Sequence, residues 1–223
     1  MTSNVVKSDQ SYDGLFKQAE GVKFLPFVGP LFRETSLRET SLRILMLGES
    51  HYGPQENNRN TRLTRSLVED DYLSASANGR RFFWTKGFRR VAAMIGGKDY
   101  YSSDNVWQQL AFYNFFQQVV GDNAKDKKHI NEQTISEARS GLQEVCKILE
   151  PNLVIVWGIG RLYDTWLPRE MNGVIPELRV FQYQYLPKTV FWAIHHPSIG
   201  FSIPEWHEKF LKVRKSIELS GVR

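Results

Sequence analysis

The sequence contains a single cysteine, Cys146, among its 223 residues. One thiol excludes an internal disulfide, a zinc site made of cysteines alone and a four-cysteine iron–sulfur cluster held by this chain. Chains without disulfides are typical of reducing compartments, so we expect a cytoplasmic protein.

Long hydrophobic runs are also missing from the sequence. No stretch approaches the roughly 20 apolar residues that a membrane span needs. The first ten residues, MTSNVVKSDQ, lack the charged start and apolar centre of a signal peptide. We therefore expect a soluble protein that does not associate with membranes.

The charge balance is basic and the composition is typical of a globular protein. Lys and Arg number 29 against 24 Asp and Glu, which gives a net charge of +5. This excess favours a polyanionic partner without requiring one. Because 41% of the residues are hydrophobic, the chain can form one sizeable core. We predict a flexible segment over residues 1–24 and one α/β domain over residues 25–223.

Four apolar runs predict strands that are buried on both faces, at residues 43–47, 110–113, 153–157 and 190–194. Amphipathic patterns predict helices over residues 88–95, 134–149 and 202–217, the second opening with Thr134 and Glu137 at capping-box spacing. The polar segment at 121–134 predicts a surface loop. Strands that alternate with helices predict a three-layer α/β sandwich around a mostly parallel, four-stranded sheet.

Polar residues follow each predicted strand directly. The four strands lead into Gly48–Tyr52, Asn114, Gly158–Gly160 and His195–Ser198. In sheets of this kind, ligands bind beyond the carboxyl ends of the strands. We therefore expect a carboxylate, an amide, a glycine turn and an imidazole to meet at one edge of the sheet.

Each of these residues also has a purely structural interpretation. Glu49 is well placed to cap a following helix, Asn114 to be a buried amide satisfied by backbone, and the histidine pair to be a packing feature. A zinc site of His51, His195 and His196 is disfavoured because adjacent histidines in an extended segment point to opposite faces. We expect no metal. The sequence GESHYG lacks the glycine of a nucleophile elbow, and WGIGRL is not a P-loop.

Four segments occur in an informative order: Gly48–Tyr52, GRRFFWTKG at 79–87, LAFYN at 110–114 and HHPSIGFS at 195–202. From about residue 25 to 215 this order resembles the uracil-DNA glycosylase superfamily. Members of that family have a water-activating loop after a strand, a phenylalanine segment, a strand ending in asparagine and a late HPS motif. GRRFFWTKG and PNLVIVWGIG are most similar to the iron–sulfur branch.

The chain departs from that family pattern at three places. The cysteines of the cluster are missing, His51 stands where the first loop has proline, and Ser50 stands where the uracil-specific branch has aspartate. These differences leave the identity of the excised base open.

The resemblance implies a DNA glycosylase that takes a flipped nucleotide into a pocket and cleaves its N-glycosidic bond. Glu49 would orient or deprotonate the attacking water, and His196 would stabilise the departing base anion. Phe82 would stack on the base and Asn114 would read its edge. The remaining residues expected to line the base pocket are Gly48, Ser50, His51 and Tyr52.

The resemblance also implies contacts with bent DNA. Ser198 would bind a phosphate, and Ile199 or Phe201 would insert into the base stack as an apolar wedge. A basic cluster around the second segment would bind further phosphates. Its members are Arg80, Arg81, Lys86, Arg89 and Arg90. We expect DNA as the partner, no cofactor and a monomer.

Uracil and a bulky modified pyrimidine, such as a decorated cytosine of phage DNA, are both open as substrates, since Tyr52 either blocks the 5-position of the base or swings away. No lysine is placed clearly enough to form a Schiff base, so we expect a monofunctional enzyme that leaves an abasic site. Two other functions remain open: a non-catalytic nucleic-acid binder on the same fold, and a hydrolase of small nucleosides.

Overall fold

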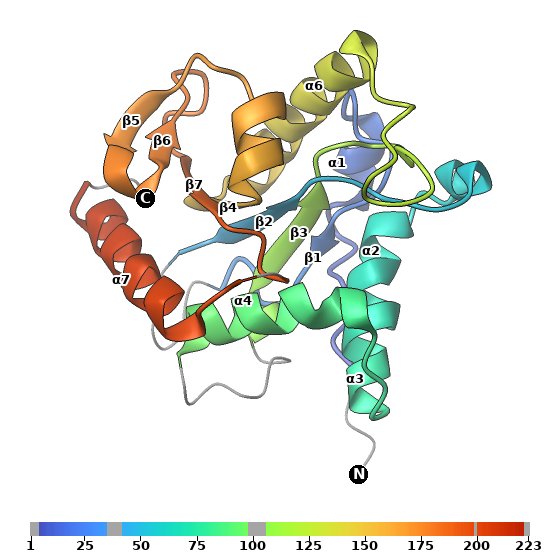
Figure 1. Cartoon of the computed structure of the whole chain (residues 1–223), viewed down its shortest axis with the longest axis horizontal. Coiled ribbons are helices and arrows are strands. Elements are labelled where there is room, and N and C mark those ends of the chain that lie inside the picture. The colour runs from blue at the N-terminus through green and yellow to red at the C-terminus, as the bar shows by residue number, and fades with distance from the viewer. Residues whose placement is uncertain (1–4, 35–41, 98–105, 199, 221–223) are drawn as a thin grey trace.

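The computed structural model describes residues 5–34, 42–97, 106–198 and 200–220, and its fold is α/β (Figure 1). One mixed sheet runs through the molecule in the order β1-β3-β2-β4-β7-β6-β5. Its strands are β1 (Phe27–Val28), β2 (Ile44–Gly48), β3 (Leu110–Asn114), β4 (Leu153–Trp157), β5 (Asn172–Ile175), β6 (Val180–Gln182) and β7 (Val190–Ile194).

The four predicted strands are confirmed as the centre of this sheet. They are β3, β2, β4 and β7, and each pairs in parallel with its neighbour. The prediction of a four-stranded sheet is wrong, however, because the sheet has seven strands. The additional strands β1, β6 and β5 pair antiparallel at the two edges. They are short, and β5 is largely exposed, so they lack the long apolar run that marks a buried strand.

Helices connect the strands and extend beyond them. The α-helices are α1 (Asp13–Gln18), α2 (Leu63–Val68), α3 (Ala75–Ala77), α4 (Lys86–Gly96), α6 (Glu132–Leu149) and α7 (Ile203–Ser220). Shorter or irregular helical segments are η1 (Gln55–Arg59), η2 (Glu69–Ser74), η3 (Phe83–Thr85), η4 (Ile159–Trp166) and η5 (Pro176–Leu178). The three predicted helices correspond to α4, α6 and α7.

The start of α6 differs from the prediction. Its capping box joins Asn131 and Thr134, whose side chains each accept a hydrogen bond from the backbone amide of the other. Glu137, the expected partner of Thr134, instead pairs with Lys23 at 2.7 Å. Asparagine is as good an N-cap as threonine, and its position one turn earlier lengthens the helix.

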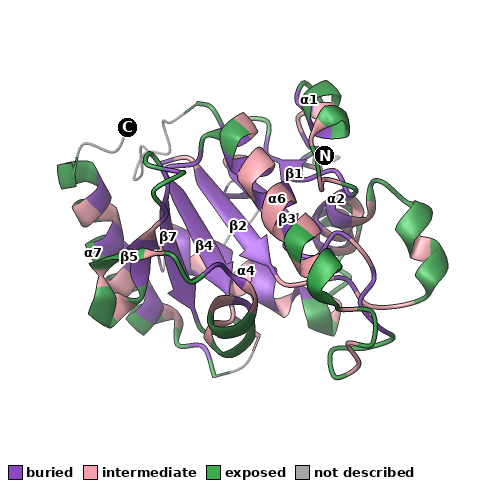
Figure 2. Ribbon diagram, turned by 90° about the horizontal axis from the view of Figure 1, so that it is seen from above, coloured by how far each residue is buried: buried purple, intermediate pink, exposed green. Residues whose placement is uncertain are grey.

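Two hydrophobic clusters cover opposite faces of the sheet. Ile44 and Met46 of β2 belong to a cluster with buried residues of α4 and α7. Leu45 and Leu47 belong to a second cluster with residues of α1 and α6. Because successive side chains of a strand point to opposite faces, helices pack on both sides of β2. Figure 2 shows the central strands buried throughout, while the helices have exposed outer faces.

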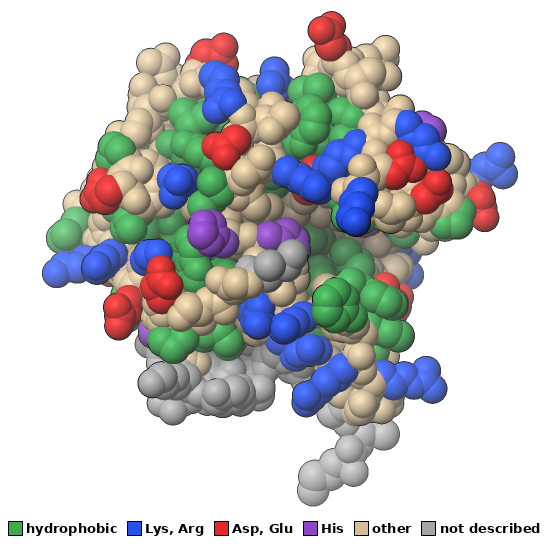
Figure 3. All heavy atoms as spheres, in the orientation of Figure 1, with side chains coloured by type: hydrophobic (Ala, Val, Ile, Leu, Met, Phe, Trp, Pro, Cys, Tyr) green, Lys and Arg blue, Asp and Glu red, His purple; other side chains and the backbone are tan. Residues whose placement is uncertain are grey.

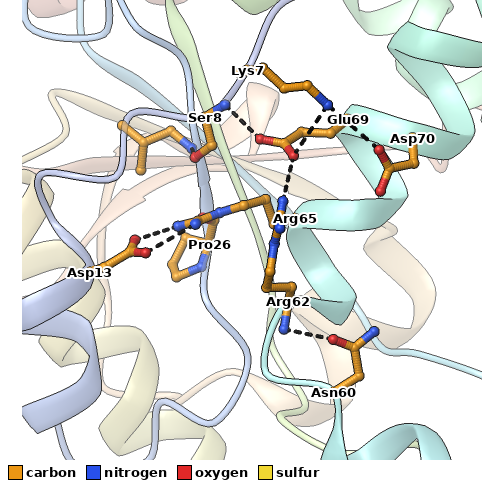
Figure 4. Close-up of polar contacts among 10 residues, drawn as sticks. Lys7, Ser8, Asp13, Pro26, Asn60, Arg62, Arg65, Glu69 and Asp70 are labelled. Atoms are coloured by element: carbon orange, nitrogen blue, oxygen red, sulfur yellow. Dashed lines mark hydrogen bonds and ion pairs between the residues drawn. The ribbon is translucent and has the colours of Figure 1, made fainter.

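Residues of the N-terminal segment, for which the sequence predicts flexibility, contact the domain in the structure. Arg65 of α2 is 1% exposed, and its guanidinium donates to both carboxylate oxygens of Asp13 and to the carbonyl of Pro26 (Figure 4). Glu69, also buried, accepts a 2.6 Å hydrogen bond from the backbone amide of Ser8. A buried arginine needs such partners, so these contacts tie the N-terminal residues to α2 and η2.

No helix within the described residues has the length and apolar character needed to cross a membrane.

Candidate functional site

The carboxyl ends of the four parallel strands lie along one edge of the sheet. Gly48, the last residue of β2, is in register with Asn114, the last residue of β3. The next turn after β4 begins at Gly158, whose φ of +108° strongly favours glycine. Histidines 195 and 196 follow β7 directly. The strands are therefore arranged as the expected gathering of polar residues at this edge requires.

Glu49 lies at this edge and is held by two side chains from distant parts of the chain. Its Oε1 forms an ion pair with Nζ of Lys127, from the loop between β3 and α6, and accepts a 3.2 Å hydrogen bond from Nε1 of Trp166, in η4. The Glu49 side chain is only 14% exposed. The sequence left open a helix-capping role for Glu49. In the structure, its carboxylate instead contacts two side chains at the sheet edge.

A second cation, Arg161, acts on the Lys127 that pairs with this carboxylate. Burial, and then the positive charge of Arg161, lower the pKa of Lys127 to about 8. Arg161 is itself fixed by a 2.9 Å hydrogen bond from its guanidinium to the carbonyl of Ala124. With two cations against one carboxylate, this edge of the site favours an anion.

The orientation of His196 is set by Ser198. The backbone amide of Ser198 donates to Nδ1 of His196 at 3.3 Å, and the Ser198 hydroxyl lies 2.6 Å from the same nitrogen. Since a backbone amide can only donate, Nδ1 is an acceptor and the neutral ring carries its proton on Nε2. The side chain of His196 is exposed, but partial desolvation by the surrounding protein, and then the charge of Arg161, lower its pKa, which favours this neutral form. Arg161 thus acts on both His196 and Lys127.

His51, which the sequence places among the base-binding residues, is buried within the domain. Its ring is buried, lies edge-on to Phe24, and has its Nε2 at 2.8 Å from Oγ1 of Thr64 and 3.0 Å from Nδ2 of Asn114. Burial lowers the pKa of His51 to about 3, so the imidazole is neutral. Its function in the fold is to hold the Asn114 amide.

Asn114 is itself buried against the end of β2. Its amide nitrogen also lies 3.4 Å from the carbonyl of Ser50. A Cβ placed at Gly48 would come within 2.2 Å of the amide oxygen, so glycine is required there. The amide is thus fixed by its neighbours, in agreement with the structural interpretation left open by the sequence.

Ser50 and Tyr52 complete the loop after β2. The hydroxyl of Ser50 is buried and has no hydrogen-bond partner among the described residues. An unpaired buried hydroxyl is costly and marks a position where a ligand group can pair. Tyr52 is half-buried and packs against the cluster that includes α6.

The segment at 79–87 forms an exposed aromatic and basic surface next to α4. The ring of Phe82 stacks on Trp84 with centroids 4.6 Å apart, and Phe83 is 80% exposed. Arg80 is exposed and Lys86 is half-buried. The ring of Phe82 therefore stacks within its own segment.

The loop after β7 differs from the expectation in two ways. Phe201 is 6% exposed and stacks on Trp206 at 5.4 Å, so it cannot insert into a base stack without leaving the core. Ser198 uses its hydroxyl and amide on His196, which makes it a positioning residue in this structure. Ile199, the other candidate wedge, lies outside the described residues.

The arginines of α4 also differ from a simple phosphate-binding face. Arg90 donates a 2.9 Å hydrogen bond to the carbonyl of Pro197 and so anchors the loop that carries His196. Arg89 has one guanidinium nitrogen that is buried and has no hydrogen-bond partner in the described part of the chain. Arg90 therefore stabilises the loop that carries His196.

The remaining histidine of the pair lies apart from the site. His195 is exposed and its ring packs against Trp206 at 5.3 Å. Within the residues that the structure describes, no group of three or more histidine, cysteine or acidic side chains is placed to hold a metal ion.

Sequence reasoning missed Lys127, Arg161 and Trp166. Lys127 stands in a run of polar residues typical of a solvated loop, and Arg161 and Trp166 follow a glycine turn without a recognisable motif. The available signal was that the turn after β4 and the loop after β3 begin at the same edge of the sheet as Glu49.

One face of the molecule is hollowed. Figure 3 shows two histidine side chains near the centre of this face, a hollow beside one of them, and Lys and Arg side chains on both sides of it.

A scan against protein-family models finds no match for the chain, and a search of curated proteins finds no similar protein.

Proposed function

We propose that the protein is a DNA glycosylase that hydrolyses the N-glycosidic bond of a flipped-out uracil or modified pyrimidine and leaves an abasic site. The proposal includes a three-layer fold of the uracil-DNA glycosylase type, supported by four parallel central strands with helices packed on both faces. We also propose that the protein is cytoplasmic and acts without a cofactor.

The observation that carries the proposal is the tautomer of His196. Cleavage of the glycosidic bond leaves negative charge on the departing base, and a fixed hydrogen-bond donor stabilises that charge as it develops. Ser198 occupies Nδ1, so Nε2–H is the donor that the neutral ring offers. Arg161, close enough to lower the pKa of His196, adds positive charge on the same side.

Glu49 supplies the complementary function. As bond cleavage proceeds, the sugar acquires oxocarbenium-like positive charge, which a carboxylate offsets while it orients the attacking water. Trp166 holds one carboxylate oxygen of Glu49 in place by donating to it at 3.2 Å. Lys127 contacts the same carboxylate oxygen, so Glu49 is held at this edge of the sheet from two sides.

DNA binding is supported by the segment at 79–87. Phe83 and Trp84 are 80% and 56% exposed, and arginines 80 and 81 precede them. Aromatic rings with adjacent cations suit unstacked bases and the phosphate backbone. We therefore assign the contacts with the DNA strand to this segment and not to Phe201.

The loop after β2 bears on the choice of base. Ser50 offers an unpaired hydroxyl, whereas the aspartate of the uracil-specific branch would add a negative charge at that position. Tyr52 packs against the domain core, so space at the 5-position of a pyrimidine depends on the path of the loop after it. A hypermodified cytosine as the substrate would indicate a role against phage DNA, and uracil would indicate a role in DNA repair.

The test is abasic-site formation on a panel of matched oligonucleotides. The panel contains uracil in duplex and single-stranded DNA and cytosines carrying large 5-substituents, with unmodified DNA and free nucleosides as controls. Release from one modified base in DNA supports the proposal and identifies the substrate. Activity on free nucleosides alone would favour a nucleoside hydrolase, and salt-sensitive binding without any release would favour a non-catalytic DNA binder.

A further inference from the structure

Lys127 brings a primary amine into the candidate site beside a base. Its Nζ contacts Oε1 of Glu49, and the same oxygen accepts the hydrogen bond from Trp166. A nucleophile in contact with a base, which a third group orients, is the arrangement of an activated nucleophile. Lys127 is 19% exposed and Glu49 14%, so both groups are largely shielded from water yet reachable.

The electrostatic surroundings make this amine unlike its neighbour in the loop. Burial and the adjacent charge of Arg161 lower the pKa of Lys127 to about 8, so an appreciable fraction is uncharged at physiological pH. Lys128, one residue later, is exposed and pairs with Asp122 and Asp126, which raise its pKa. Only the uncharged amine is a nucleophile, and the uncharged fraction is larger at Lys127 than at Lys128.

We propose that Lys127 makes the site an abasic-site lyase, so that the strand is cut at a site that has lost its base. The inference rests on the proposed function, because base release would generate the substrate next to Glu49. It changes the expectation of a monofunctional enzyme, which depended on the sequence offering no clearly placed lysine.

The proposed step balances without a cofactor. The Lys127 amine attacks C1′ of the open-chain aldehyde, a C–N bond forms, and the aldehyde oxygen leaves as water to give an imine. Glu49 removes a proton from C2′, the C2′–C3′ double bond forms, and the C3′–O bond breaks, so that the downstream strand leaves with a 5′-phosphate end. Water then hydrolyses the imine and regenerates the lysine.

The test uses the full chain and a duplex with one preformed natural abasic site, so that it does not depend on base release. Borohydride reduces the imine and traps a covalent protein–DNA adduct, which migrates slowly on a denaturing gel. Lys127→Arg retains the positive charge but has no primary amine, and Lys128→Arg is the matched control. A tetrahydrofuran site has no aldehyde and serves as the DNA control.

We expect an adduct and strand cleavage with the wild type and with Lys128→Arg, and loss of both to background with folded Lys127→Arg or with tetrahydrofuran DNA. Absence of a trapped adduct with the wild type would overturn the lyase proposal, and so would an adduct that persists in Lys127→Arg. Base release, measured separately on the oligonucleotide panel, tests the glycosylase, so the two proposals can fail independently.

Discussion

The backbone amide of Ser198 lies 3.3 Å from Nδ1 of His196, and this contact fixes which ring nitrogen is free to act. An amide hydrogen cannot be accepted by a protonated nitrogen, so the neutral ring presents Nε2–H. Partial desolvation and the charge of Arg161 lower the pKa of His196 and so favour the neutral ring. The structure therefore supports a neutral histidine as the donor to a leaving base.

Ser198→Ala should slow base release roughly fivefold, because the hydroxyl contact to Nδ1 is lost while the amide contact remains, and one net hydrogen bond contributes about 1 kcal/mol. Single-turnover release from the preferred substrate measures this effect. Ser198→Thr keeps a hydroxyl and should recover most of the rate. If Ser198→Ala instead weakens DNA binding without changing the rate at saturation, Ser198 contacts phosphate and does not position His196.

Glu49→Gln should reduce base release by about 10²- to 10⁴-fold, the range for loss of a positioned general base. DNA affinity should be unchanged or higher, because Lys127 loses its negatively charged partner. Glu56→Gln, at an exposed position in η1, is the matched control and should behave as the wild type. Unchanged release in Glu49→Gln, with DNA binding intact, would remove Glu49 from the mechanism.

Phe83→Ala and Trp84→Ala should each weaken binding to single-stranded DNA by about 1–3 kcal/mol, the contribution of one base stacked on an aromatic ring. Tyr185→Ala removes an exposed aromatic ring from the loop between β6 and β7 and should leave affinity unchanged. Fluorescence anisotropy of a labelled oligonucleotide at two salt concentrations measures both. Equal affinities in all three variants would show that the exposed aromatic segment does not bind DNA.

His51 should make the protein sensitive to acid. Its pKa falls from 6.5 to about 3 on burial, so between these values the unfolded state binds a proton that the folded state does not. This residue alone should therefore lower the free energy of unfolding by about 2 kcal/mol from pH 7 to pH 5. Urea unfolding at the two pH values measures the loss.

The matched comparison is between His51→Gln and His129→Gln, the latter at an exposed position. His51→Gln should be less stable at pH 7, because Asn114 and Thr64 lose their partner, but its stability should change less with pH. A pH dependence equal to that of His129→Gln would contradict the assignment.

Much of the central fold could be predicted from the sequence because its signals are local. Runs such as LVIVW at 153–157 can be buried on both faces only in the middle of a sheet, and all four such runs are central strands. Glu49 and His196 were found because they directly follow those runs. The edge strands were missed because pairing with β3 or β7 defines them, not their own composition.

The contacts within the site depend on residues far apart in the chain and could not be predicted. Glu49 and Lys127 are 78 residues apart, and Trp166 is 117 residues from Glu49. His51 was assigned to the pocket by its place in the loop, but its Nε2 interacts with Thr64 and Asn114 inside the domain. Position after a strand predicts that a side chain lies near the edge, not the direction in which it points.

The most direct test of the account is single-turnover base release by His196→Ala compared with His195→Ala. The two variants remove neighbouring, exposed imidazoles, but only His196 has the Nδ1 contact with Ser198 that leaves Nε2–H as a donor. We predict that His196→Ala loses about 10²- to 10³-fold in rate, the contribution of one preorganised donor, and that His195→Ala retains wild-type activity. Equal rates in the two variants, or no base release by the wild type from any modified DNA, would contradict the glycosylase assignment.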